Sequence, residues 1–477
     1  MTKIEVPYRG SGKVYFDEKE YQCDLYYNEE QGGIRILLNV KNEKSLGNFL
    51  QVPLELPHLC GRLENGFMFT LLRLKRIKTE GLVSYRMTRF TYNAEYILCG
   101  VISEGNHEQT FHTVEFVLSN IVEWGEESVY KIGERSELTK KCDEVKKVIY
   151  TGRGVCINYL VRGSILPITN YDLLKEHIEI RQYGIIEISF EKEEKFGEFI
   201  EIFRKLKGLI EIASLRKANV EKVFAYSEEV VYDMSYNELE HPVEVYGIDI
   251  QENNNGIHSQ SSRRKWISLS ELIAQNSFEC YFEKHSELAP IIELYLEPFY
   301  VEFSSETRIF LNIVQALETY HSRFITNDTD EFRERVENLA KAFPPKRGED
   351  IRKLLMAKNK KFITLESRIF DLLIANGQYR FDTGEIQLEE FPSVIAYTRN
   401  YYIHYDERIR KSRRVLKEEE LKFYNRSLFQ ILDYYILLEL GFSDLFELKR
   451  KLDERWGNIS QQLSMLKLSR FRNNPQT

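Results

Sequence analysis

The spacing of apolar residues divides the chain into two parts. Up to about residue 250, short segments such as GKVYFD, IRILLNV and HTVEFVL often alternate apolar with polar positions and are rich in Tyr, Val, Ile, Phe and Thr. This period of two is typical of half-buried β-strands. One stretch, EKFGEFIEIFRKLKGLIEIAS, has its apolar residues at helical spacing instead. Many strands interrupted by one helix predict packed antiparallel sheets.

The second part follows a polar segment, QENNNGIHSQSS, which we interpret as a linker. Beyond it, stretches such as FLNIVQALETYHSRF and EEELKFYNRSLFQILDYYILLELGF place their apolar residues on one face of a helix. The sequence therefore predicts an α+β multidomain protein with a β-rich front and an all-α back. The predicted parts are a β-rich domain at 1–127, a second β-rich subdomain with one helix at 140–250, a linker with connecting helices at 251–300, and a helical domain at 301–477.

Charge and cysteine content narrow the class of protein. The net charge of −8 argues against nucleic-acid binding over the whole surface but leaves room for a local basic site. None of the six cysteines forms a CxxC pair, so we predict neither a zinc site nor a disulfide framework. The sequence contains neither an apolar run of about 18 residues nor an apolar signal segment at its start. We therefore expect a cytoplasmic protein that does not bind a membrane.

Two local patterns could carry chemistry but have simpler explanations. GSGK, at residues 10–13, lacks the GxxxxGK[ST] spacing of a phosphate-binding loop. Glu318 and His321 lie three residues apart on one helical face, where they could bind a metal ion, but a capped or solvent-facing pair is the stronger interpretation. We predict no metal site and no cofactor.

The segment RNYYIHYDERIRKSRR, at residues 399–414, carries the strongest chemical signal. Its first part places Arg399, Asn400 and His404 on a helix that opens near Pro392. RNA supplies its own nucleophile, the 2′-OH. Histidine can move protons near neutral pH, and the planar fork of arginine suits phosphate oxygens. A run of cations that could bind RNA phosphates follows: Arg408, Arg410, Lys411, Arg413, Arg414 and Lys417.

Helical geometry adds a constraint on this pair. Five residues of an α-helix turn through about 500°, so Arg399 and His404 point about 140° apart and lie about 7.5 Å apart along the axis. One straight helix cannot direct both side chains at one phosphorus atom. Either the helix breaks before His404, or two copies of the chain meet at a two-fold axis and share a cleft.

The order of these features resembles a known family. R-N-x-x-x-H, late in a helical bundle and followed by a long helix ending in LLELG, is similar to the signature of the HEPN superfamily of ribonucleases. FLNIVQALETYHSRF resembles the first bundle helix of the ApeA-like, or Abi-associated, HEPN proteins, and the β-rich front resembles their N-terminal domain. The resemblance implies that Arg399 and His404 are the catalytic pair. It also implies that Asn400 is the polar accessory residue and that Glu318 is a supporting acidic residue.

The resemblance also implies a function. It indicates a metal-independent endoribonuclease in bacterial antiviral defence, acting as a homodimer formed through the helical domain. The β-rich front would sense a phage-derived trigger and restrain the enzyme. The alternative is a HEPN-like module that binds nucleic acid or a partner protein without cutting. Simpler interpretations are that the tyrosines of the segment are core aromatics and that its basic run is a solvated surface.

Overall fold

The computed structural model describes residues 8–17, 19–28, 33–41, 52–82, 87–102, 108–134, 137–163, 180–228, 231–234, 237–240, 242–247, 266–301, 304–356, 362–374 and 379–457. The predicted linker, residues 251–262, lies outside this part of the chain. Internal contacts divide the chain into two units: Met1–Lys207 with Ala218–Ser261, and Gly208–Lys217 with Ser262–Thr477. Each unit is described by itself. The finer division into four parts stays a prediction.

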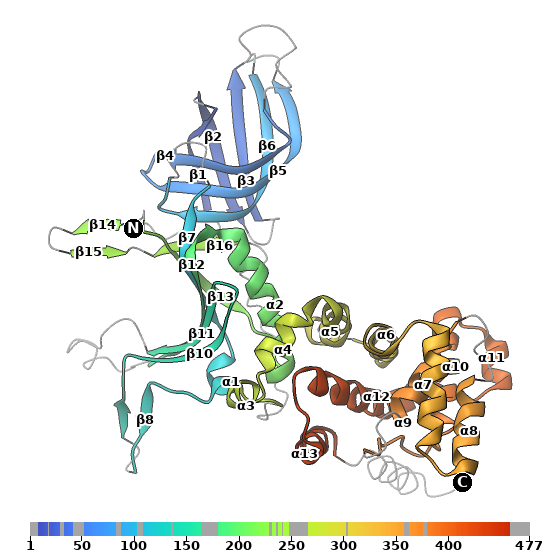
Figure 1. Cartoon of the computed structure of the whole chain (residues 1–477). Coiled ribbons are helices and arrows are strands. Elements are labelled where there is room, and N and C mark those ends of the chain that lie inside the picture. Colours follow the sequence, from blue (N-terminus) through green and yellow to red (C-terminus); the bar gives the residue numbers. More distant parts are fainter. Residues whose placement is uncertain are drawn as a thin grey trace, which may run out of the picture. The chain divides into compact units, whose positions relative to one another are not determined.

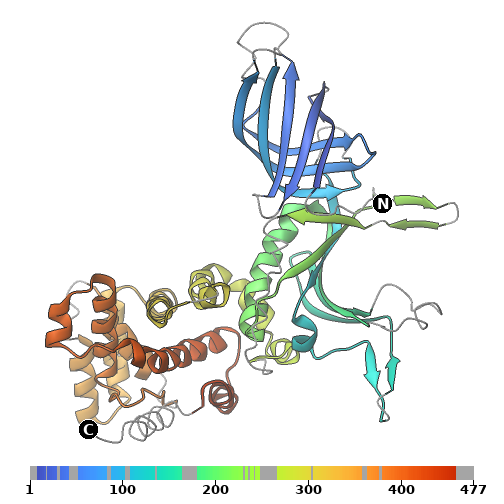
Figure 2. The same ribbon diagram turned by 180° about the vertical axis from the view of Figure 1, so that it is seen from behind.

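The first unit begins with a closed barrel of antiparallel strands, drawn in blue in Figure 1 and seen from behind in Figure 2. Its strands are β1 (Tyr8–Phe16), β2 (Lys19–Asn28), β3 (Gly33–Lys41), β4 (Glu55–Leu63), β5 (Met68–Leu82) and β6 (Met87–Cys99). They pair in the order β6-β3-β2-β1-β4-β5, and β5 pairs again with β6. This closure leaves no free sheet edge among the six strands. The interior holds the alternating apolar side chains that the sequence predicts, such as Leu25, Ile36 and Leu71.

The sheet continues beyond the barrel through β16, which pairs with β6. The order of this extension is β10-β11-β12-β7-β13-β16. Helix α2 (Phe196–Ser214) is the helix predicted within the β-rich region, and its Phe203 stacks on Phe116 of β7 with ring centroids 3.9 Å apart. The remaining elements of this region are β7 (Thr110–Leu118), α1 (Ile121–Gly125), β8 (Tyr130–Ile132), β9 (Leu138–Lys140), β10 (Glu144–Gly152), β11 (Val155–Gly163), β12 (Gln182–Lys195), β13 (Val220–Tyr226), β14 (Val231–Met234), β15 (Asn237–Glu240) and β16 (Val243–Gly247).

The second unit is helical. Its elements are α3 (Leu269–Ala274), α4 (Ser277–Glu283), α5 (His285–Tyr300), α6 (Glu306–Tyr320), the π-helix η5 (His321–Ile325), α7 (Thr329–Lys341), α8 (Pro345–Met356), α9 (Leu365–Ile374), α10 (Phe391–His404), α11 (Glu407–Ser412), α12 (Glu418–Glu439) and α13 (Leu445–Trp456). Helix α12 runs through the core, with Leu428, Ile431 and Leu432 buried, and packs against α6. Helix α10 packs against α6, α9 and α11.

Helix α12 is also held by a buried carboxylate. Asp433 accepts hydrogen bonds from Tyr295 of α5 (2.8 Å) and Trp456 of α13 (2.7 Å), and it pairs with Arg455 at 2.9 Å. A buried charge must be paired and hydrogen-bonded to be tolerated, and these contacts tie three helices together. The predicted fold class, a β-rich front followed by a helical back, is confirmed. None of the described helices combines the length and apolar character needed to cross a bilayer.

Candidate functional site

Helix α10 carries the Arg-Asn-His motif and presents it away from the bundle core. Its inner face is buried, whereas Arg399 and Asn400 are half-buried and His404 is exposed. Thr398 fixes the helix from inside, because its hydroxyl donates to the Val394 carbonyl and accepts from the backbone N–H of Leu416. The buried residues are Phe391, Pro392, Val394, Ile395, Thr398 and Tyr401. The apolar face therefore anchors the helix and leaves the motif accessible.

The helix continues without a break through both ends of the motif. His404 is its last residue, and the chain turns at Tyr405, which has φ 49° and lies in the left-handed region. The alternative in which the helix breaks before His404 is therefore wrong. Arg399 and His404 keep the divergence of an uninterrupted helix, about 140° around the axis and about 7.5 Å along it. Within one copy, the two side chains do not converge on one atom.

Asn400 lies in contact with the arginine of the motif. The Arg399 guanidinium donates to the Asn400 side-chain oxygen at 3.3 Å. Within the described residues, no ion pair involves Arg399 or His404. An arginine without a carboxylate partner keeps its charge available for an anion such as a phosphate. The contact with Asn400 restricts the direction in which that charge is presented.

The basic run contains a short helix and is only partly neutralised. Asp406 caps α11 and pairs with Arg408 at 3.0 Å, and this hydrogen-bonded contact holds the pKa of the Asp406 carboxyl below its ordinary value. Arg410 approaches Glu407 at 3.6 Å. The other four cations are exposed and form no ion pair with another residue in the described part of the chain: Lys411, Arg413, Arg414 and Lys417. The surface beside the motif therefore carries cations available to a polyanion.

Aromatic rings lie among these cations. The Arg413 guanidinium lies 5.2 Å from the Tyr397 ring centroid, and that of Arg410 lies 5.9 Å from that of Tyr401. Tyr401 is buried, which fits the interpretation of a core aromatic. Tyr405, directly after His404, is 65% exposed. The surface next to the motif thus combines arginines with an exposed ring, both of which can stack on nucleic-acid bases.

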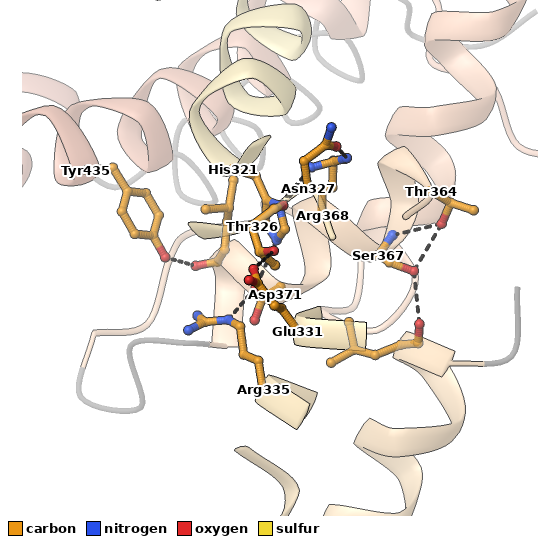
Figure 3. A network of polar contacts seen from close by, with 12 residues as sticks. His321, Thr326, Asn327, Glu331, Arg335, Thr364, Ser367, Arg368, Asp371 and Tyr435 are labelled. Atoms are coloured by element: carbon orange, nitrogen blue, oxygen red, sulfur yellow. Dashed lines mark hydrogen bonds and ion pairs between the residues drawn. The ribbon is translucent and has the colours of Figure 1, made fainter. Parts of the chain in front are cut away.

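Glu318 lies on α6 and His321 at the start of η5, whereas the Arg-Asn-His motif lies on α10. Figure 3 shows His321 within a network of polar contacts that includes Arg368 and Asp371. His321 is fully buried at the start of η5, so the solvent-facing interpretation is wrong for this residue. Its Nε2 contacts Asp371 at 2.9 Å, and its Nδ1 contacts the Arg368 guanidinium at 3.0 Å. Glu318 is half-buried and acts electrostatically on Arg368, favouring its charged form against the effect of burial.

The contacts of His321 define its protonation. The Arg368 guanidinium can only donate, so Nδ1 must accept and the proton of a neutral ring lies on Nε2, facing Asp371. Burial lowers the pKa of His321, although Asp371 opposes this effect. Arg335 also pairs with Asp371, at 2.9 Å. Both ring nitrogens of His321 are therefore occupied, and the described residues contain no group of three or more side chains suited to a metal ion.

Sequence reasoning missed this buried network because no local motif encodes it. Asp371 lies 50 residues from His321 in the chain. In the sequence, Arg368 and Asp371 are simply two polar residues within the apolar stretch LESRIFDLLI. A pair of polar residues three apart in an otherwise buried helix was the available signal. By contrast, the Arg-Asn-His motif is contiguous in sequence and could be found without the fold.

The fold and the exposed motif define a class of protein: a β-rich front joined to a helical domain that carries an Arg-Asn-x-x-x-His helix. Comparison with protein families agrees with this class. The model for ApeA N-terminal domain 1 matches residues 8–281, and the model for the Apea-like HEPN domain matches residues 311–445. The chain therefore belongs to the ApeA-like HEPN family. The second match includes Glu318 and the whole motif on α10. Searches of curated proteins and of solved structures found no match.

Proposed function

We propose that this protein is a metal-independent endoribonuclease acting in bacterial anti-phage defence. The observation that carries the proposal is the complete Arg399–Asn400–His404 motif on an accessible, unbroken helix within the region that matches the HEPN domain. The adjoining unpaired cations support RNA as the substrate. The cytoplasm is the proposed location, since RNA and a phage-derived trigger would both be met there.

In the proposed reaction, the 2′-oxygen of RNA attacks the adjacent phosphorus and the bond to the 5′-oxygen breaks. His404 accepts the proton of the 2′-OH and delivers a proton to the leaving 5′-oxygen, so no proton is gained or lost overall. Arg399 binds the non-bridging oxygens, where negative charge increases in the transition state. Asn400 positions the guanidinium through its hydrogen bond. The products are a 2′,3′-cyclic phosphate and a free 5′-hydroxyl.

The divergence of the two side chains supports a shared site. We propose that Arg399 of one copy acts with His404 of its partner across a two-fold axis, which gives a symmetric dimer two equivalent pairs. Control by the β-rich front follows from this arrangement, because a displacement of about 1 Å between reacting groups can reduce the rate about 100-fold. Binding of a phage-derived trigger to the front would bring the two copies into register. Glu318 lies beside Arg368, and a supporting role for it stays a prediction.

The test compares RNA cleavage by the wild type, His404→Asn and Arg399→Lys, each in EDTA. Asparagine keeps a hydrogen-bonding group but cannot exchange protons near neutral pH, and we expect cleavage at least about 100-fold slower. Lysine keeps the charge but loses the bidentate fork, and we expect a comparable loss. Arg450→Lys, an exposed arginine on α13 that lies outside the motif, is the matched control.

The outcomes separate the proposal from its alternative. If both motif variants fold and cut at the wild-type rate, the site assignment is wrong. If the wild type binds RNA but, both alone and with extract of phage-infected cells as a source of the trigger, produces no more cleavage than His404→Asn, the protein is a binding module of the HEPN type. In either case, circular dichroism and thermal melting establish that the variants fold, because Arg399 and His404 lie at the surface and do not support the core.

A further inference from the structure

A second feature of the helical unit lies near the opposite end of α10 from His404. A cavity of about 410 Å³ is lined by residues of α8, the end of α9 and the segment that leads into α10. A smaller hollow of about 230 Å³ adjoins it, and the two share Arg380, Phe381, Gln387 and Leu388. From Phe391 to Arg399 the helix rises about 12 Å. The cavity is therefore separate from the Arg-Asn-His motif.

One wall of the cavity is aromatic and held in place. Tyr379 and Phe381 lie with ring centroids 4.9 Å apart at 70°, and Tyr379 stacks on Tyr434 of α12 at 5.5 Å. The Gln430 side-chain amide donates to the Tyr379 hydroxyl at 3.1 Å. Phe343 lines the cavity as well. Phe381 is 3% exposed and Tyr379 is half-buried, so Tyr379 is the ring of this wall that a planar group such as a nucleobase can contact.

The polar groups of the cavity differ in how they are engaged. Arg347 donates to Glu389 at 2.6 Å, and this hydrogen bond holds the pKa of the Glu389 carboxyl below its ordinary value. Arg380 is exposed, lines both hollows and acts electrostatically on Glu389, but it forms no hydrogen bond or ion pair with another described residue. Gln387 also lines both hollows, and its side-chain amide forms no hydrogen bond within the described residues. One guanidinium and one amide are therefore available to a ligand.

We propose that this cavity binds a nucleoside monophosphate group, with the base against Tyr379 and the phosphate on Arg380. The volume lies within the range of about 300–1,000 Å³ that is usual for small-ligand sites. An apolar ligand would leave Arg380 without a partner, and inorganic phosphate would leave the aromatic wall uncovered. Gln387 can hydrogen-bond to the edge of a base, and Glu389 can accept from an amino group of the base or a ribose hydroxyl.

Two sources share this chemistry: a free mononucleotide acting as an effector, and one nucleotide of an RNA strand bound to the protein. The proposal does not rest on cleavage, because binding is measured in the full-length His404→Ala protein, which leaves RNA intact. Calorimetric titrations use AMP, GMP, CMP and UMP in one series and a six-nucleotide RNA in the other. Each is repeated with Arg380→Gln and with Lys346→Gln. Lys346 is exposed and lies next to Arg347, but it does not line the cavity.

We expect Arg380→Gln to weaken binding by about 10- to 100-fold, as for loss of a charge-assisted hydrogen bond to phosphate. Lys346→Gln should change the Kd by no more than about twofold, since Lys346 does not line the cavity and its exposed charge is screened by solvent. Leu388→Trp, which fills the cavity, should weaken binding as Arg380→Gln does.

If the mononucleotides bind the parent protein and Arg380→Gln weakens that binding, the cavity is a site for a free nucleotide. If only the six-nucleotide RNA binds and Arg380→Gln weakens that binding, the cavity is a subsite for an RNA strand. If neither probe binds, or if Arg380→Gln and Lys346→Gln behave alike, the proposal is overturned. Cleavage assays with intact His404 are scored separately, so a protein that never cuts RNA could still bind a nucleotide here.

Discussion

The shared site can be tested by complementation between two inactive variants. Arg399→Ala and His404→Ala each lose one member of the pair, and neither homodimer has a complete site. When they are mixed, a mixed dimer contains one Arg399 and one His404, on different chains. The divergence of about 140° on the unbroken α10 is the reason for the proposal that the two groups come from different copies. Mixing should therefore restore cleavage that neither variant shows alone.

The size of the recovery follows from symmetry. Random exchange gives about one half mixed dimers, and each has one complete pair where the wild type has two, so activity should reach about one quarter of the wild-type value per chain. The assay follows a fluorogenic RNA after subunit exchange, with the mixed species counted by native mass spectrometry. Arg399→Ala mixed with the Arg399→Ala, His404→Ala double variant is the matched control and should stay inactive.

Mixed dimers that do not cut RNA would exclude a shared site. If mixed dimers form in the expected proportion and still do not cut, the pair does not act across the two-fold axis. A site contained in one chain predicts this result, because neither chain of the mixed dimer has both groups. Activity that stays constant per chain when the wild type is diluted into monomers would contradict the shared site independently.

Three further outcomes follow. When Arg410, Arg413 and Arg414 are all replaced by glutamine, the slope of log K against log salt for RNA binding should become shallower by about 1.4 to 2.1, and the lower value is expected if Glu407 already neutralises Arg410. Arg408→Gln should change the slope least, because the charge of Arg408 is paired with Asp406. An unchanged slope in the triple variant would mean that the basic run is a solvated surface. Product RNA should carry 2′,3′-cyclic phosphate and 5′-hydroxyl ends in EDTA, and 5′-phosphate ends would indicate activated water instead. Burial lowers the pKa of His321, so the unfolded chain binds a proton at this residue more readily than the folded chain does. The stability that His321 contributes is therefore complete above about pH 6.5 and is lost as pH falls. Between pH 7.5 and 5.5 the melting temperature should fall more steeply for the wild type than for His321→Gln, and equal slopes would contradict a buried, neutral His321.

Local pattern accounts for what the sequence could predict. The period of two identified the strands, and the helical period identified the long helices, because both are set by residues close in the chain. The closure of the barrel could not be inferred, since it depends on the pairing of β1 with β4 and of β3 with β6, strands that are not consecutive in the chain. Helix α11 was likewise hidden: six residues with four charges have no apolar face to reveal a helix, and its cap at Asp406 becomes clear only in the fold.

The two histidines of the helical unit show why the fold is needed to assign chemistry. In sequence, His321 with Glu318 and His404 with Arg399 are both spaced pairs of polar residues that could form a site. In the structure, His321 has no exposed surface, and both of its ring nitrogens are used inside the network with Asp371 and Arg368. A ring in that state cannot exchange protons with a substrate unless the helices separate, and its contacts serve to hold η5 against α9.

His404 has the opposite properties. It is exposed at the end of α10, and among the described residues no ion pair holds it. Its side chain is therefore accessible to a substrate at the surface, but it lacks the positioning that burial gives His321. A second copy of the chain can supply that positioning, because the groups that face His404 across a two-fold axis would include the partner's arginine. Burial thus makes His321 structural, whereas the exposure of His404 supports the proposed dependence on a dimer, which the mixed-variant experiment tests directly.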